Sequence, residues 1–204
     1  MKLEAEYWHG DQFAANFLGD RSSDLIPLGH NYVDVDAIML HREFRTTAML
    51  RNIPNTMTLV DLEQILNLVC PGKYDFVYLR VDFNNQHNVG YAFINFIEVQ
   101  FLASFVMFIS GRSWNRYSGN KVAHVCFAAM QGVDTLIAHF RNSAVQQQWA
   151  PFRANWYWSD HIQPDGGIAT RPNAGQKRPF PPPNAPLVVG APLAPPPPPV
   201  VTQQ

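Results

Sequence analysis

One stretch, from Val89 to Phe96, constrains the fold of this chain more than any other: Val-Gly-Tyr-Ala-Phe-Ile-Asn-Phe. Side chains alternate between the two faces of a β-strand, so one face of this run carries Ala92, Ile94 and Phe96. The opposite face carries Tyr91, Phe93 and Asn95. The first set predicts a core surface. The second predicts a pair of rings on which unstacked nucleobases can lie, each base contributing about 1–3 kcal/mol.

The same run resembles the eight-residue signature of the RNA recognition motif, Lys/Arg-Gly-Phe/Tyr-Gly/Ala-Phe-Val-x-Phe/Tyr. Seven of its eight positions agree when Ile is accepted for Val, and the exception is Val89, where the signature has a basic residue. The six-residue partner signature falls at Ala48-Met49-Leu50-Arg51-Asn52-Ile53. Met49 replaces its usual aromatic residue, so a third stacking ring is absent, although the polarizable sulfur can still contact a base.

Four strands and two helices are expected around these signatures. The strands are 46–53, 74–83, 89–96 and 121–129. A helix opens at Thr58 with Asp61 in capping-box spacing and ends at Cys70-Pro71-Gly72, and a second runs from Glu98 to Ser110. The order strand–helix–strand–strand–helix–strand predicts an α+β, ferredoxin-like βαββαβ fold with one sheet face free of helices.

Two features leave alternatives open. The second strand carries Phe76, Tyr78, Arg80 and Asp82 on the outer face, either free to meet RNA or covered by a later helix. The helix from Glu98 is apolar nearly all round, because Phe101, Met107 and Phe108 lie outside its core stripe. Either the tryptophans further along the chain cover this surplus, or it forms a groove for a partner.

The chain divides into four segments. Residues 1–44 are expected to be a partly disordered N-terminal extension, and residues 45–131 the RNA recognition motif. Residues 132–160 add a helix, packed over the open sheet face or beside it, and a stretch rich in tryptophan that docks onto surplus apolar surface. Residues 161–204 hold 13 of the 17 prolines and predict a disordered tail of polyproline II character, with an SH3- or WW-type partner as a minority interpretation.

Charge and composition narrow the function classes. The net charge is −1, and residues 45–145 carry eight basic and six acidic side chains, which predicts modest RNA affinity and a shallow salt dependence. Cys70 and Cys126 have no metal-ligand or disulfide spacing. No secretory signal or membrane span is expected. We therefore expect an intracellular protein, nuclear or cytoplasmic, without metal, cofactor or membrane contact, and with nothing that indicates DNA.

Four blocks closely resemble the C-terminal RNA recognition motif of the Mei-two-like proteins, meiosis-regulating RNA-binding proteins of fungi and plants. They are residues 45–55, 74–83, 88–96 and 136–143, and the likeness extends from about Val33 to Phe180. The resemblance implies an added C-terminal helix, RNA binding through the sheet, and post-transcriptional control of meiosis or differentiation. Family members usually carry further such motifs in a longer chain, so a role that requires several of them is not carried over.

The leading hypothesis is single-stranded RNA binding. Tyr91 and Phe93 stack bases, Met49 adds an apolar contact, and Tyr78 is a further candidate ring. The polar residues of the site are expected to contact phosphates or base edges; they are Arg51, Asn52, Arg80 and Lys121. The alternative is a protein-interaction module with a covered sheet that binds through the apolar second helix and the proline-rich tail. An enzyme is not expected, because His124 and His139 have no convergent carboxylate or cysteine, and no catalytic residue is assigned.

Overall fold

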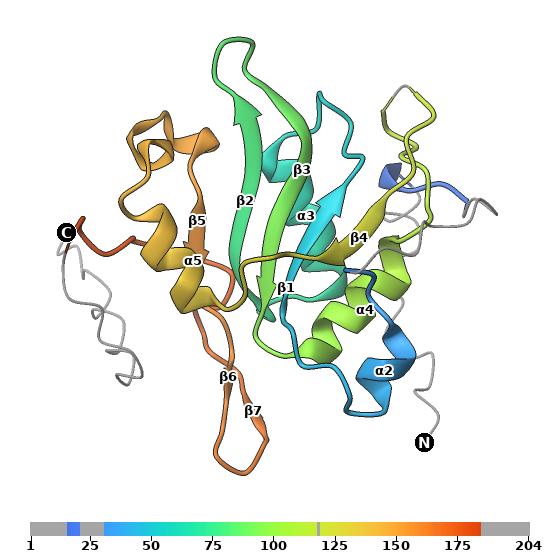
Figure 1. Ribbon diagram of the computed structural model, residues 1–204, viewed down its shortest axis with the longest axis vertical. Helices are drawn as coiled ribbons and strands as arrows, with labels where there is room; N and C mark the ends of the chain where they lie inside the picture. The colour runs from blue at the N-terminus through green and yellow to red at the C-terminus, as the bar shows by residue number, and fades with distance from the viewer. Residues whose placement is uncertain (1–15, 21–30, 118, 185–204) are drawn as a thin grey trace, which may run out of the picture.

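The computed structural model describes residues 16–20, 31–117 and 119–184, and its main feature is a six-stranded sheet in the order β4-β1-β3-β2-β5-β8 (Figure 1). The first four strands in the chain are β1 (Thr47–Arg51), β2 (Tyr74–Asp82), β3 (His87–Phe96) and β4 (His124–Phe127). All their pairings are antiparallel. With helices α3 (Leu59–Val69) and α4 (Val99–Ile109), they confirm the predicted ferredoxin-like order.

The inner face of the sheet packs against α3 and α4. Its buried residues come from alternate positions on the four strands: Ala48, Leu50, Val77, Leu79, Ala92, Ile94, Val125 and Phe127. Helix α3 begins at the predicted capping box, where Thr58 Oγ1 accepts from the Asp61 N–H at 3.2 Å and the Asp61 carboxylate accepts from the Thr58 N–H at 2.9 Å. Local sequence chemistry therefore sets this helix start, and the strand alternation sets the core.

Part of the surplus apolar surface of α4 is covered from the N-terminal side. Of the later tryptophans, Trp149 is exposed and Trp156 packs in the separate cluster beneath the added helix. Helix α2 (Val35–Met39) packs against α4 (Figure 1). Its Ile38 is buried in the core. Phe17 and Leu18 are buried in the same cluster. Met107 is the most exposed of the surplus residues, at 44%. Residues 16–20 and 31–44, the described part of the predicted N-terminal extension, are thus part of the folded domain.

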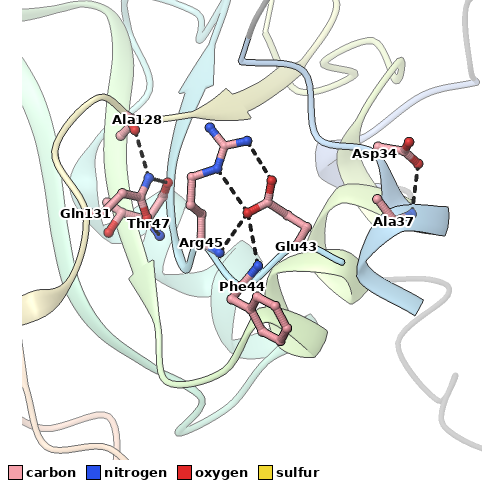
Figure 2. A network of polar contacts seen from close by, with 8 residues as sticks. All are labelled: Asp34, Ala37, Glu43, Phe44, Arg45, Thr47, Ala128 and Gln131. Atoms are coloured by element: carbon pink, nitrogen blue, oxygen red, sulfur yellow. Dashed lines mark hydrogen bonds and ion pairs between the residues drawn. The ribbon is translucent and has the colours of Figure 1, made fainter. Parts of the chain in front are cut away.

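Helix α5 (Val133–Phe140) is the predicted added helix, and it lies over β2 on the outer face of the sheet. A polar clamp fixes its start: the Gln131 side chain accepts from the Thr47 N–H at 2.9 Å and donates to the carbonyls of Thr47 and Ala128 (Figure 2). The Gly132 N–H donates to Thr47 Oγ1 at 2.8 Å. The amide of Gln131 thereby continues the pairing with β1 beyond the end of β4, and α5 leaves from that point.

The segment leading into β1 is held by one carboxylate. Glu43 Oε1 accepts from the backbone N–H groups of Phe44 and Arg45 and from Arg45 Nε, each at 3.0 Å, and the Arg45 guanidinium also pairs with Oε2 (Figure 2). These bonds hold the pKa of Glu43 at about 2. The same guanidinium lies 3.9 Å from the centroid of the Phe127 ring, so the approach to β1 is tied to β4.

After α5 the chain is ordered much further than predicted. Two 3₁₀ turns, η1 (Ala144–Gln147) and η2 (Ala150–Phe152), lead to β5 (Asn155–Tyr157), which pairs with β2. A hairpin of β6 (His161–Ile162) and β7 (Ile168–Ala169) follows, and β8 (Lys177–Arg178) adds a sixth strand beside β5. The predicted disordered tail from residue 161 is therefore wrong for residues 161–184. Residues 185–204, with the Pro195 to Pro199 run, lie outside the described part.

Polar anchors explain why this segment folds. Asp160 is buried, and its carboxylate pairs with Lys73 Nζ at 2.5 Å and accepts from the Arg171 N–H at 2.8 Å. Tyr157 donates to Glu63 Oε1 at 2.5 Å and packs edge-on against Tyr74. The anchors join residues 157–171 to α3 and to the start of β2, so proline content there does not prevent order. Among the described residues, no helix is long and apolar enough to cross a bilayer.

Candidate nucleic-acid interface

The outer face of the sheet is organised in rows of paired residues. One row runs from Cys126 through Met49 and Phe93 to Tyr78, and the next runs from His124 through Arg51 to Tyr91. Helix α5 lies over only part of this surface. We call the outer side chains of β1, β3 and β4 the open half, namely Met49, Arg51, Tyr91, Phe93 and His124, and those of β2 beneath α5, Phe76 and Tyr78, the covered half.

Tyr91 and Phe93 lie side by side in the open half. Their ring centroids are 5.7 Å apart and the ring planes meet at 82°, an edge-to-face arrangement. Both are partly exposed, and Phe93 also touches the apolar cluster beneath α5 whereas Tyr91 is not part of it. The pair is therefore presented to solvent and supported from one side, as the sequence predicted.

The backbone of the eight-residue run explains its glycine. Gly90 has φ +94°, a backbone conformation that favours glycine. Its carbonyl accepts a hydrogen bond from the Ile53 N–H at 3.0 Å. This bond ties β3 to the segment that follows β1. Val89 stands at the position where the signature has a basic residue, and it is 40% exposed. Because valine is uncharged, this position supplies no positive charge near the rings.

The covered half is closed by aromatic packing. Phe140 of α5 lies 5.4 Å from the Phe76 ring and 4.8 Å from the Tyr78 ring, centroid to centroid. Phe76 is fully buried and Tyr78 is 2% exposed, and burial raises the pKa of the Tyr78 hydroxyl. Tyr78 is therefore not available for stacking in this conformation, which corrects its place among the candidate rings. Of the two alternatives for Phe76 and Tyr78, cover by a later helix is the one observed.

The predicted polar residues fall into two groups. Arg51 and Arg80 are exposed, Arg51 within the row that contains Tyr91 and Arg80 two residues beyond Tyr78 on β2. Lys121 is exposed as well, but its Nζ donates to the Ile53 carbonyl at 3.0 Å and to Asn55 Oδ1 at 2.7 Å. Asn52 has φ +58° and its carbonyl accepts from Trp114 Nε1 at 2.9 Å. Lys121 and Asn52 thus fasten the loop after β1, at the edge of the open half.

Residues that sequence reasoning left out of the site are also found in these rows. His124 stands beside Arg51 on β4 and is partly buried, and this burial together with the positive charge of Arg51 lowers its pKa. Its imidazole is therefore neutral at pH 7, with one nitrogen able to donate and the other to accept. Cys126 Sγ donates to the Met49 carbonyl at 3.7 Å, which holds β4 and β1 together below Met49. In the strand predicted over residues 121–129, alternation with the inward Val125 and Phe127 puts His124 on the outer face, and this was the sequence signal for its place here.

Asn95 and Asp75 form a buried polar group at the border with α5. Asn95 was expected to face outward and is 3% exposed, because Nδ2 donates to Asp75 Oδ1 at 2.8 Å and Oδ1 accepts from Thr47 Oγ1 at 2.7 Å. The register between β2 and β3 is irregular at Asp75, which directs this carboxyl under the helix. Burial raises the pKa of Asp75 to about 7. The pair is closed to a ligand, and it is linked to the start of α5 through Thr47, whose hydroxyl also accepts from the Gly132 N–H.

The open half can hold bases on Tyr91, Phe93 and Met49 and can meet phosphate oxygens with Arg51, and the exposed Arg80 of β2 adds a second cation to the outer face. Within the described ranges, no group of three or more His, Cys, Asp or Glu side chains is placed to bind a metal ion. The thiol of Cys70 is buried, which raises its pKa to about 12, so it is not a thiolate at neutral pH. The surface chemistry is that of a stacking and phosphate-contacting face.

Comparison with known proteins agrees with this geometry. Residues 45–141 match the family model described as RNA recognition motif 2. The protein named MEI2-like 1 of Arabidopsis thaliana is 40% identical over 149 residues, which are 73% of this chain and 15% of that protein. The meiosis protein mei2 of Schizosaccharomyces pombe is 40% identical over 154 residues, 76% of this chain and 19% of that protein.

This chain thus spans under one fifth of the length of those relatives. Among solved structures, the RNA recognition motif of Rna15 with bound RNA (GU) is 20% identical, with a TM-score of 0.38. The alignment covers 44% of this chain and 89% of that one.

Proposed function

Because residues 45–141 match the family model described as RNA recognition motif 2, we propose that this chain binds single-stranded RNA through the open half of its sheet. The observation that carries the proposal is the partly exposed pair of rings, Tyr91 and Phe93. Met49 lies in the row of Phe93 and Arg51 in the row of Tyr91. Each base that stacks on an aromatic side chain contributes about 1–3 kcal/mol. Two such contacts supply most of the affinity that a weakly charged face can offer.

Electrostatics plays the smaller part. Arg51 and Arg80 are the exposed cations closest in the sheet to the rings, and Lys121 stands at the edge. For single-stranded nucleic acid, each phosphate contact contributes about 0.7 to the slope of log affinity against log salt. We expect two or three contacts, and therefore a salt slope of about −1.5 to −2.

The biological role we propose is post-transcriptional regulation in meiosis or differentiation, inside the cell, in the nucleus or the cytoplasm. It is supported by relatives that are named as MEI2-like and meiosis proteins. Crosslinking in cells followed by sequencing of the attached RNA tests this role and identifies the target together. Attached transcripts unrelated to either process contradict it.

Replacing both rings, as Tyr91→Ala with Phe93→Ala, tests the binding site directly. We expect affinity for a pool of single-stranded RNA, measured by fluorescence anisotropy, to fall about 100-fold or more, because two stacking contacts are lost. Tyr78→Phe is the matched control, since Tyr78 is covered by α5 and its loss of a hydroxyl leaves the open half unchanged. Undiminished binding by a folded double variant rejects the site.

A further inference from the structure

A second surface with ligand-binding chemistry lies on the far side of α5 from the open half. It is a cleft of about 760 Å³, bounded by the end of α5 and η1, by β5, and by residues 178–184. This volume is within the range of about 300–1,000 Å³ that small-molecule-sized ligands fill. The Asn184 N–H donates to Asn142 Oδ1 at 3.2 Å, so the proline-rich wall is fastened to the loop after α5.

The lining of this cleft is basic and rich in amides. It includes three arginines, Arg141, Arg153 and Arg178, and no aspartate or glutamate among the described residues that line it. Amide side chains such as Asn142 and Gln147 stand beside them. Arginine offers a planar fork of donors that matches phosphate, and amides can pair with the edges of bases. We therefore call this surface the arginine cleft.

Arg178 contacts two indole rings. Its guanidinium carbon lies 3.5 Å from the centroid of the Trp156 ring and 4.4 Å from that of Trp158. Burial, followed by the positive charge of Arg171, lowers its pKa to about 10, so it remains charged at pH 7. Phe180 packs against Trp156 with ring centroids 6.4 Å apart. The cleft therefore combines a preordered cation with an aromatic wall.

The arginine cleft and the open half share one face of the sheet. A row of paired residues runs from Thr47 through Asn95, Phe76 and Trp156 to Arg178, so Trp156 and Arg178 extend the outer face beyond α5. Helix α5 covers the middle of this row through Phe140 and Phe76. A single strand of RNA that is held by Tyr91 and Phe93 and continues toward β8 meets the cleft on the other side of α5.

We propose that the arginine cleft is a second RNA contact, which binds the phosphates and a base of the same single strand after it has left the open half. This inference rests on the proposed function. The arginines contact phosphate oxygens, and the amides and the aromatic wall contact a base. The added helix and the segment up to Asn184 then lengthen the RNA site and do not merely cover the sheet.

Two RNA lengths separate this proposal from the function on which it rests. We compare single-stranded RNA of about four nucleotides with RNA of about twelve, a span within that of known single-strand sites. The full chain and the variant Arg153→Ala with Arg178→Ala are titrated by anisotropy. We expect the variant to lose about tenfold in affinity for the long RNA, with a salt slope smaller by about 1.4, and to bind the short RNA as the parent chain does.

Arg42→Ala with Arg116→Ala removes the same charge from arginines that do not line the cleft, and we expect it to bind both RNAs normally. Equal binding of the long RNA by the cleft variant and the parent overturns the cleft proposal, while sensitivity to loss of Tyr91 and Phe93 still supports the open half. Binding that needs Arg153 and Arg178 but not the two rings overturns the open half and supports the cleft. Preference of the cleft for an acidic peptide over the long RNA overturns the cleft proposal.

A second measurement does not depend on a folded variant. The parent chain is crosslinked by light to long RNA that carries 4-thiouridine, and the modified peptides are mapped by mass spectrometry. We expect adducts on Trp156 or Phe180 in addition to Tyr91 or Phe93. Adducts confined to the open half contradict the cleft, and an absence of adducts at the two rings contradicts the proposed function.

Discussion

The open and covered halves of the sheet each carry one tyrosine and one phenylalanine, and they differ in whether a helix lies above these rings. Tyr91 and Phe93 on β3 remain partly exposed, whereas Tyr78 and Phe76 on β2 are buried by Phe140 of α5. Phe93 and Tyr78 even face each other in the same row. The comparison teaches that an aromatic residue on the free face of this fold becomes a binding residue or a core residue according to where one later helix docks.

The covered half should carry more of the stability. Phe140→Ala removes a side chain that is 7% exposed and packs on two rings, so we expect the free energy of unfolding to fall by about 3–5 kcal/mol. Tyr91→Ala, in the open half, should cost less than about 1 kcal/mol because surface changes are mild. Urea denaturation of both variants measures this, and equal losses contradict the division of the sheet into two halves.

Asp75 makes the covered half sensitive to pH. Its pKa is raised to about 7 from an ordinary value of 3.8, so the folded state binds more protons than the unfolded state between these values. The contribution of Asp75 to stability is therefore full below about pH 4 and is lost as pH rises toward 7, by about 2–4 kcal/mol. We expect Asp75→Asn to remove most of this decline in urea titrations at pH 5 and pH 8. A decline of the same size in the variant contradicts the assignment.

Thr47 connects the two halves. Its hydroxyl donates to Asn95 Oδ1, which also accepts from Thr46 Oγ1, and it accepts from the Gly132 N–H at the start of α5. Thr47→Val therefore removes one of two donors to Asn95 and leaves the partly buried Gly132 N–H without its acceptor. The expected cost is about 1–3 kcal/mol. Hydrogen exchange should accelerate at the amides of α5 more than at those of β3. Equal acceleration in both elements contradicts a role in positioning the helix.

The smallest effect is expected from a single cation of the open half. Arg51→Gln should weaken RNA binding severalfold and reduce the salt slope by about 0.7, because one phosphate contact is lost. Arg42→Gln, an exposed arginine near α2, is the matched control and should change neither quantity. An unchanged salt slope for Arg51→Gln shows that the Arg51 side chain does not contact an RNA phosphate.

The order of elements follows from local sequence signals. The capping box at Thr58 and Asp61, the glycine at Gly90 and the alternation of Ala92 and Ile94 each act over a few residues, and each is observed. The ring pair of the candidate site is predicted for the same reason. Strand periodicity states which face a side chain is on, and for Tyr91 and Phe93 that was sufficient.

The remaining features depend on contacts between distant segments. Nothing near Tyr78 in the chain indicates that Phe140 covers it, and nothing near Asn95 indicates a bond to Asp75 across the sheet. The order of residues 161–184 likewise depends on Asp160 meeting Lys73. Proline content predicts disorder only when such polar anchors are absent. Lys73 and Asp160 are 87 residues apart, so no local sequence pattern indicates that they pair.

The central claim is that RNA meets the open half while α5 remains in place. Chemical-shift mapping by NMR during titration of the full chain with single-stranded RNA tests it most directly. The account predicts large shifts at Met49, Tyr91 and Phe93, with Tyr78 and Phe140 nearly unchanged. Large shifts at Tyr78 and Phe140 with loss of the α5 hydrogen bonds, and none at Tyr91 and Phe93, contradict it.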